Sequence, residues 1–202
     1  MKKIIALILV IGCILSLASC NFINKPSDEQ PDDSHAIPDI QAKIDASAPA
    51  GADITVSFKT SLGVLNGSYD VAYNEDGTAT VAYSYEKFNT FTEGETSAEL
   101  KSTYTGTVTV SADGTVSGDL GTEGLAAVSF DLHLNESKLS AVSISAGVLT
   151  AQVKAADTAA VLGVALDYDV QLAVITGTNG ITSMTVSYTT ALGEVEIVTL
   201  YK

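Results

Sequence analysis

Arginine and tryptophan are absent from this chain of 202 residues, and cysteine occurs only at positions 13 and 20. Without arginine, the chain lacks the forked guanidinium group that recognises phosphate and carboxylate groups, and its ten lysines face 24 acidic residues. This balance argues against nucleic acid as a partner, because phosphate backbones are bound through clustered basic side chains. Beyond residue 20, the lack of cysteine excludes disulfides and thiolate metal sites, and we expect no cofactor.

The motifs of common enzyme classes are also missing. The chain has no Gly-rich phosphate loop, no Gly-x-Ser-x-Gly elbow and no His-Glu-x-x-His sequence. His133 is predicted on a polar surface beside Asp131. The nearby acidic residues Glu86, Glu93 and Glu95 leave a carboxylate-based hydrolase as a third option, although sequence proximity does not place two carboxylates across a cleft. We therefore expect a protein that is not an enzyme and has no metal site.

The first 20 residues are organised like an export signal. A basic start, Met1-Lys2-Lys3, precedes an apolar run of about 15 residues, shorter than the roughly 20 needed to span a bilayer. The run closes with Leu17, Ala18, Ser19 and Cys20, which resemble the lipobox of bacterial lipoproteins. The resemblance implies that residues 1–19 form a signal peptide, cleaved before Cys20, and that the Cys20 sulfur is diacylated with palmitate-like chains.

Residues 20–37 are predicted to be the lipidated cysteine followed by a disordered acidic tether. Prolines and carboxylates dominate this stretch, and such a composition cannot bury enough apolar surface to fold. After loss of the signal, eight lysines and 24 acidic residues give a formal charge of −16, which anionic headgroups repel. Attachment then depends on two or more acyl chains, so we expect a lipid-anchored protein on the extracytoplasmic face of the cell membrane.

Residues 38–202 are predicted to be a single, mainly β domain. A short helix is expected over 38–47, because Ile37, Ile40 and Ile44 recur on one helical face. From Asp53 onward apolar and polar residues alternate, which favours strands, with a helical turn expected over 155–162. We predict an antiparallel meander of about ten strands in a curved sheet, half-barrel or sandwich, with one or two short helices.

Glycine-containing turns predict the pairing of several strands. A three-residue loop at 75–77 sets Val71 opposite Val81 and Tyr69 opposite Tyr83, which keeps the apolar side chains on one face. Similar loops are predicted at 112–114, 178–180 and 191–193. The pairs that follow are Val110–Val116, Val174–Met184, Leu172–Val186, Val170–Tyr188, Val186–Val198 and Met184–Leu200.

Three residue sets are predicted to share a face of the sheet. The longest alternation is a candidate ligand-facing apolar strand: Val164, Leu166, Tyr168, Val170, Leu172 and Val174. A second strand is expected through Val128, Phe130, Leu132 and Leu134. The aromatic cluster Tyr69, Tyr73, Tyr83 and Tyr85 is interpreted as sheet core, with a sugar-stacking platform as the alternative.

The order of an early helix, a strand meander and a small helical insertion over residues 37–202 distantly resembles the LolA-type lipoprotein-carrier fold. The resemblance implies a curved antiparallel sheet that holds acyl chains on its concave side. The first functional hypothesis is therefore a non-catalytic binding lipoprotein for an apolar or lipid ligand. The alternative is a cell-envelope interaction module that binds polysaccharide or protein through its outer face.

Overall fold

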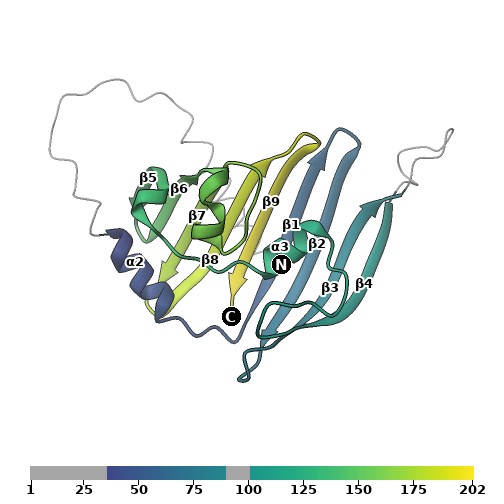
Figure 1. Cartoon of the computed structure of the whole chain (residues 1–202), viewed down its shortest axis with the longest axis horizontal. Helices are drawn as coiled ribbons and strands as arrows, with labels where there is room; N and C mark the ends of the chain where they lie inside the picture. Colours follow the sequence, from purple (N-terminus) through teal and green to yellow (C-terminus); the bar gives the residue numbers. More distant parts are fainter. Residues whose placement is uncertain (1–35, 90–100) are drawn as a thin grey trace. The chain divides into compact units, whose positions relative to one another are not determined.

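The computed structural model describes residues 36–89 and 101–202, which belong to one compact unit spanning 32–202 (Figure 1). Its centre is an antiparallel sheet of nine strands, in agreement with the predicted fold class. The strands are β1 (Gly51–Thr60), β2 (Gly63–Tyr73), β3 (Ala79–Phe88), β4 (Lys101–Val110), β5 (Leu139–Ser145), β6 (Val148–Val153), β7 (Val170–Gly177), β8 (Gly180–Thr189) and β9 (Gly193–Tyr201).

The sheet is open, and its spatial order is β4-β3-β2-β1-β9-β8-β7-β6-β5. Strands β1 to β4 form one meander and β5 to β9 a second. The two meanders join where the first strand pairs with the last, with Val56 opposite Ile197. The connection from β4 to β5 crosses the sheet from one edge to the other, so it provides a cover for one face.

Three short helices lie on this face of the sheet, which we call the inner face (Figure 1). They are α2 (Ala36–Asp45), α3 (Thr122–Val128) and α4 (Thr158–Leu162), accompanied by the 3-10 turns η2 (Glu136–Lys138) and η3 (Ala155–Asp157). Helix α2 contacts β7 and β8, whereas α3 contacts β1 and β2. The early helix and the helical turn over 155–162 are thus confirmed.

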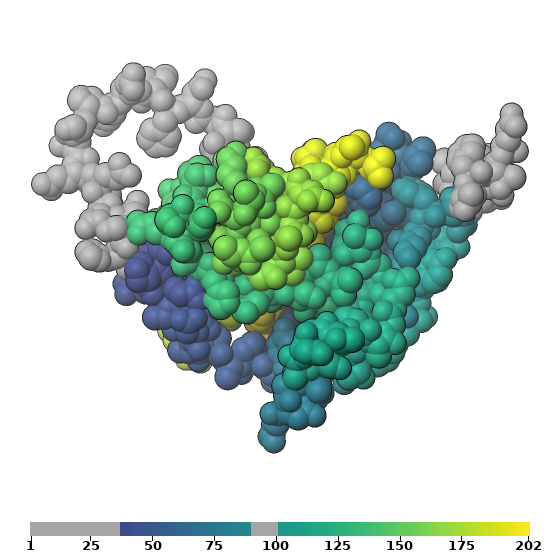
Figure 2. All heavy atoms as spheres, viewed as in Figure 1, coloured from purple at the N-terminus to yellow at the C-terminus, as the bar shows by residue number. Residues whose placement is uncertain are grey.

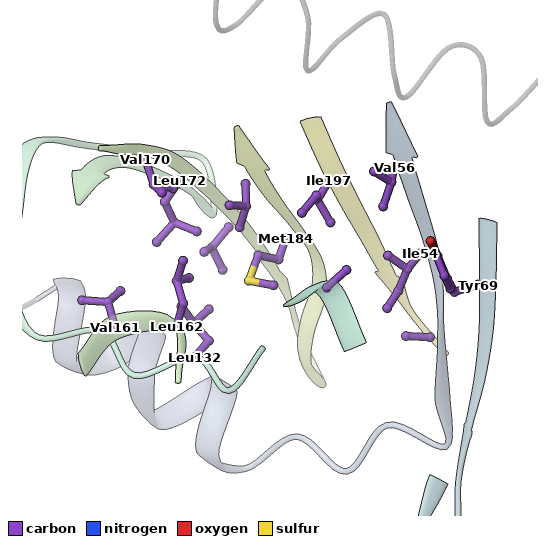
Figure 3. Packing of buried hydrophobic residues seen from close by; sticks show 14 of the residues in the cluster. Ile54, Val56, Tyr69, Leu132, Val161, Leu162, Val170, Leu172, Met184 and Ile197 are labelled. Carbon is purple, nitrogen blue, oxygen red and sulfur yellow. The ribbon is translucent and has the colours of Figure 1, made fainter. Parts of the chain in front are cut away.

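The core is a layer of apolar side chains between the inner face and its cover. Figure 3 shows Leu132, Val161 and Leu162 pointing toward Leu172 and Met184 on the sheet. All five side chains are buried, and Val161 and Leu162 are fully inaccessible. Full burial of side chains of this size stabilises a fold by about 1.5–3 kcal/mol each, so the cover belongs to the core.

The first two predicted turns are confirmed. Strands β2 and β3 pair with Val71 opposite Val81 and Tyr69 opposite Tyr83, and Gly77 adopts a left-handed φ of 80°. Val110 pairs with Val116 across the second turn. Glycine suits the left-handed position of such turns because it has no Cβ to clash with the backbone.

The predicted strand from Val164 is wrong in its first half. Strand β7 begins only at Val170, and the preceding residues form an irregular segment after Gly163. The hydroxyl of Thr158 accepts a hydrogen bond from the Leu166 amide at 2.8 Å and donates to the Ala155 carbonyl at 2.9 Å. This side chain replaces a neighbouring strand as a partner for the backbone, so the segment needs no place in the sheet.

The second predicted strand, through Val128, Phe130, Leu132 and Leu134, is also wrong. Val128 ends α3, and the residues that follow are irregular and run beside α4. The Asp131 amide donates to the Leu162 carbonyl at 2.9 Å, and the His133 amide donates to Val161 at 2.8 Å. The alternation reflects burial of Leu132 and Leu134 from an extended segment that covers the core.

The last two predicted turns differ from the structure. The pairs Val174–Met184, Leu172–Val186 and Val170–Tyr188 are confirmed, but the loop has two residues and a bulge lies between Ile175 and Thr176. The turn after β8 is shifted by one residue: Val186 pairs with Ile197 instead of Val198, and Met184 pairs with Thr199 instead of Leu200. The shift brings Val195 opposite Tyr188 in place of Glu196, which keeps the inner face apolar.

Candidate functional site

A line of apolar and aromatic residues crosses the inner face beyond α3. Leu65, Phe58, Val195 and Tyr188 follow one another on β2, β1, β9 and β8 as direct cross-strand partners. In the view of Figure 2, the segments 111–135 and 155–169 cover the lower part of the inner face. The start of β9 and the end of β1 are visible above them. We call this row of residues, of which Val195 and Tyr85 are buried, the aromatic strip: Tyr168, Tyr188, Val195, Phe58, Leu65, Tyr85 and Tyr104.

One end of the aromatic strip is a pair of stacked tyrosines. The rings of Tyr168 and Tyr188 lie 5.5 Å apart with 7° between their planes, and Tyr168 is 38% exposed. Tyr168 belongs to the irregular segment before β7, which the contacts of Thr158 hold in place. Burial, followed by the nearby charge of Glu123, raises the pKa of Tyr188 to about 12.

A hollow of about 640 Å³ adjoins the tyrosine pair. It is open, and most of the strand residues that line it have a register that places them on the opposite face of the sheet, which we call the outer face. Its volume falls within the 300–1,000 Å³ range that is typical of small-molecule sites. The residues lining it are Ser57, Lys59, Asp167, Tyr168, Asp169, Gln171, Ser187, Tyr188, Thr189, Glu194, Val195 and Glu196.

The other end of the aromatic strip is built around Tyr85 and Tyr104. Their rings stack at 5.4 Å, and the amine of Lys87 lies 5.2 Å from the centre of the Tyr85 ring. Asp119, from the crossover, accepts a hydrogen bond from Lys87 at 3.1 Å. This bond raises the pKa of Lys87, while burial raises that of Tyr85.

A second hollow, of about 210 Å³, lies between this tyrosine pair and the start of α3. Its floor is largely apolar and includes Val56, Phe58, Leu65 and Tyr85, and Glu123 stands at its rim. Phe58 and Leu65 are half-buried, so their side chains remain accessible from the hollow. The aromatic strip thus joins two hollows over six strands, from β8 to β4, a distance of roughly 24 Å at the usual strand spacing.

Tyr69 fixes α3 at the edge of the second hollow. Its hydroxyl donates to the Leu120 carbonyl at 2.9 Å, and its ring fits against two glycines. A Cβ on Gly124 of α3 would lie 2.3 Å from the ring, and one on Gly67 of β2 would lie 2.9 Å from it. Tyr69 is only 3% exposed, so it supports the aromatic strip from below without reaching a ligand.

The predicted tyrosine cluster is partly core and partly surface. All four residues share the inner face; Tyr69 and Tyr85 are buried, Tyr83 is half-buried and Tyr73 is 42% exposed. The core interpretation therefore holds for Tyr69 and Tyr85. Tyr104, which stacks on Tyr85, was not singled out from the sequence, because Gly106 and threonines surround it in β4.

The predicted ligand-facing strand contributes to the aromatic strip only through Tyr168. Val170, Leu172 and Val174 are at most 1% exposed and belong to the closed core, where Figure 3 shows Val170 and Leu172. Leu166 is half-buried beside them. An apolar ligand on the inner face of β7 would have to displace the protein's own side chains.

The remaining sequence candidates take surface or supporting positions. His133 lies on the surface beside Asp131, with 3.1 Å between Nε2 and Oδ2, as predicted. Glu86 accepts a hydrogen bond from the Asn66 amide at 2.8 Å, which lowers its pKa. The other two acidic residues of that group, Glu93 and Glu95, lie outside the described residues, as do Leu17, Ala18, Ser19 and Cys20.

Within residues 36–89 and 101–202, no three His, Cys, Asp or Glu side chains converge in a way that would hold a metal ion. No helix in this part of the chain has the length and apolar character to cross a bilayer. Comparison with known proteins finds no matching family model and no similar curated protein. The functional argument therefore rests on the aromatic strip and its hollows.

Proposed function

We propose that this protein is a non-catalytic lipoprotein, anchored through Cys20 to the extracytoplasmic face of the cell membrane, that binds an apolar or amphipathic ligand along the aromatic strip. The observation that supports the proposal is the row of half-buried side chains Tyr188, Phe58 and Leu65, with the buried Val195 between Tyr188 and Phe58, beside two hollows. Concave sites lined by aromatic and apolar groups with a few polar side chains are the usual form of ligand sites.

The aromatic strip replaces the inner face of β7 as the ligand surface in this proposal. Tyr104 is 45% exposed and Tyr168 38% exposed, so an aromatic surface is accessible at each end. Phe58 and Leu65 supply aliphatic and aromatic area between them without entering the closed core. A bound ligand would gain roughly 25 cal/mol for every Å² of apolar surface that it removes from water.

Native mass spectrometry of the lipoprotein, extracted from its own membrane, tests this proposal. The wild-type protein is expected to retain a ligand mass, and the variant Tyr104→Ser with Tyr168→Ser is expected to lose most of it. Thr105→Ala with Thr107→Ala is the matched control, because both threonines are exposed on the outer face of the same strand as Tyr104. Absence of a ligand in the wild type, or equal retention by all three proteins, would contradict the proposal.

A second candidate function is an envelope module that binds polysaccharide. It is favoured by the polar side of the larger hollow, which continues into a polar cross-strand row on the outer face. This row consists of Gln152, Gln171, Ser187, Glu196, Ser57 and Asn66. A glycan array would support this candidate if binding to one polysaccharide class were lost in Gln171→Ala with Ser187→Ala and kept in Tyr104→Ser.

A further inference from the structure

The two edges of the sheet differ in how they are protected against further pairing. Strand β5, at one edge, carries a bulge between Ser140 and Ser143, and Ala141 within it adopts a left-handed φ of 48°. Strand β4, at the other edge (Figure 1), pairs with β3 along its whole length without a shift in register. Bulges, prolines and charged side chains are the usual devices that keep an edge strand from pairing with another chain. Residues 102–108 of β4 have none of these devices.

The crossover closes only the last part of the β4 edge. The Thr109 amide donates to the Ser117 hydroxyl at 2.9 Å, and the Thr109 carbonyl accepts from the Ser117 amide at 3.0 Å. The backbone groups of Thr109 therefore point away from β3. Alternate residues of a strand direct their backbone groups to the same side, so those of Thr103, Thr105 and Thr107 also point outward. In the part of the chain that the structure describes, no backbone group of another segment bonds to these three residues on that side.

The sequence of β4 is complementary to itself about Thr105. When two copies of the strand lie antiparallel with Thr105 opposite its own counterpart, Thr103 faces Thr107 and Tyr104 faces Gly106. The threonine pairs lie on the outer face, where threonines opposite one another on neighbouring strands can form hydrogen bonds. A contact of this kind uses the same surface on both copies. It therefore closes as a two-fold dimer and does not extend into a fibre.

On the inner face, the same register sets an exposed aromatic ring opposite a glycine. Tyr104 is 45% exposed, although its ring stacks on that of Tyr85. Gly106 leaves room for the Tyr83 side chain, because a Cβ at this position would lie 2.6 Å from the Tyr83 hydroxyl. In the paired strands each Tyr104 lies opposite the partner's Gly106 and reaches the partner's Tyr83, so aromatic surface is removed from water without a clash between side chains.

We propose that two copies of this protein pair through their β4 edges, antiparallel about Thr105, so that two nine-stranded sheets form one continuous sheet. This inference goes beyond ligand binding and does not depend on it. The paired stretch 102–108 contains no charged side chain, so no like charges oppose each other within it. Seven residues per copy are fewer than the about 20–30 per side of a standard interface, so the dimer is weak and dissociates on dilution. Attachment of both copies to one membrane would raise their effective concentration.

Disulfide formation by single-cysteine variants tests the register. The protein is the chain from Asn21, which contains the whole compact unit 32–202 and no cysteine. In the proposed dimer the two Cα atoms of residue 105 lie about 5.5 Å apart, within the roughly 4.4–6.8 Å that a disulfide usually spans. The two copies of residue 107 are four residues apart along the strands, roughly 13 Å, which is too far. In a glutathione redox buffer, Thr105→Cys is therefore expected to give at least tenfold more disulfide dimer than the matched control Thr107→Cys on non-reducing gels.

The other outcomes would overturn the proposed pairing. Equal yields from the two cysteine variants would show that copies meet without this register. Absence of a disulfide dimer from Thr105→Cys would show that the β4 edges do not meet about this residue. Sedimentation velocity of the wild-type chain is expected to show a dimer that grows with concentration, and a monomer at every concentration would also contradict the inference.

A pair of charge variants provides a second measurement without cysteine. Thr105 is exposed on the outer face, so Thr105→Lys and Thr105→Glu should leave the circular dichroism spectrum unchanged. Either variant alone places like charges directly opposite each other, and we expect its dimer to be at least tenfold weaker than that of the wild type in sedimentation velocity. An equal mixture of the two variants should restore the dimer. Undiminished dimerisation of Thr105→Lys alone, or no dimer in the mixture, would overturn the inference.

Discussion

The hydroxyl of Tyr69 provides a sharp test of how the crossover is held on the sheet. Tyr69 and Leu120 are 3% and 2% exposed, and the hydroxyl donates to the Leu120 carbonyl at 2.9 Å. Tyr69→Phe leaves that buried carbonyl without this partner, which costs about 1–3 kcal/mol. A loss of about 2 kcal/mol lowers the Tm of a domain of this size by roughly 4–8 °C.

The same variant has a predicted pH dependence. Burial, followed by the charge of Glu123, raises the pKa of Tyr69 in the folded protein, so the folded state favours the protonated phenol. Its contribution to stability is complete below the unfolded pKa of about 10 and is lost as the pH rises from there toward the higher folded pKa. Between pH 9 and pH 11, wild type should therefore lose stability that Tyr69→Phe does not lose.

Urea denaturation followed by circular dichroism at pH 7, 9, 10 and 11 measures both effects. The free energy of unfolding of Tyr69→Phe should lie below that of wild type at pH 7, and the difference should shrink above pH 10. Equal stability at pH 7 would refute the role of the hydrogen bond. A difference that stays constant up to pH 11 would refute the burial of an uncharged hydroxyl.

Four further substitutions test the closed core, the contact between α3 and Tyr69, the stability at low pH and the lipid anchor. Leu162→Ala removes a fully buried side chain and should lower the free energy of unfolding by about 2–5 kcal/mol in urea, whereas a loss below about 1 kcal/mol would contradict a closed core. Gly124→Ala places a Cβ 2.3 Å from the Tyr69 ring and should cost about 1–3 kcal/mol, measured as a lower Tm; an unchanged Tm would contradict this close packing. The hydrogen bond from Lys154 lowers the pKa of Asp169, so the contribution of the Asp169 carboxylate to stability is present above the unfolded pKa and lost as the pH falls through the folded pKa. Asp169→Asn should therefore flatten the decline in the free energy of unfolding below pH 4 during acid titration. An unchanged acid profile would count against this ion pair. Cys20→Ser should move the protein from the membrane to the soluble fraction on immunoblots with its circular dichroism spectrum unchanged, and membrane retention of the cleaved variant would refute lipid anchoring.

Local sequence patterns are sufficient to predict the β2–β3 hairpin. Val71, Val81, Tyr69 and Tyr83 can share a face only if the loop has three residues, and Gly77 permits that loop. The turn after β8 has no such constraint from its nearest residues. Its register depends on the apolar contact of Tyr188 with Val195, and β9 also pairs with β1, far away in the chain.

Alternation alone could not separate strands from covering segments. Leu132 and Leu134 bury alternate side chains from an irregular segment, as a strand would, but their backbone follows α4 and has no place in the sheet. Tyr168 likewise reaches the aromatic strip from a segment held by Thr158. Such extended segments show the two-residue alternation of a strand because their side chains point in turn to the core and to solvent. This holds whether or not their backbone is hydrogen-bonded in a sheet.

The complete aromatic strip could not be predicted, because its hairpins are brought together only by the order of the strands in the sheet. Phe58 and Val195 lie side by side because the first and last strands pair, and no local pattern indicates that pairing. Tyr104 joins through the fourth strand and Tyr168 through the loop before the seventh. The contacts within single hairpins, Phe58–Leu65, Tyr188–Val195 and those among the β2–β3 tyrosines, are local in sequence.

The position of β9 at the centre of the sheet makes it the strand that unites the two meanders. Ala52 faces Tyr201, and the Lys202 amide donates to the Gly51 carbonyl at 2.9 Å. A chain that stops short of β9 therefore lacks a central strand and leaves the edges of β1 and β8 unpaired, as sites for aggregation or proteolysis. The two meanders also define a natural place to divide the gene, and fragments ending and beginning in the crossover are expected to reassemble through β1 and β9.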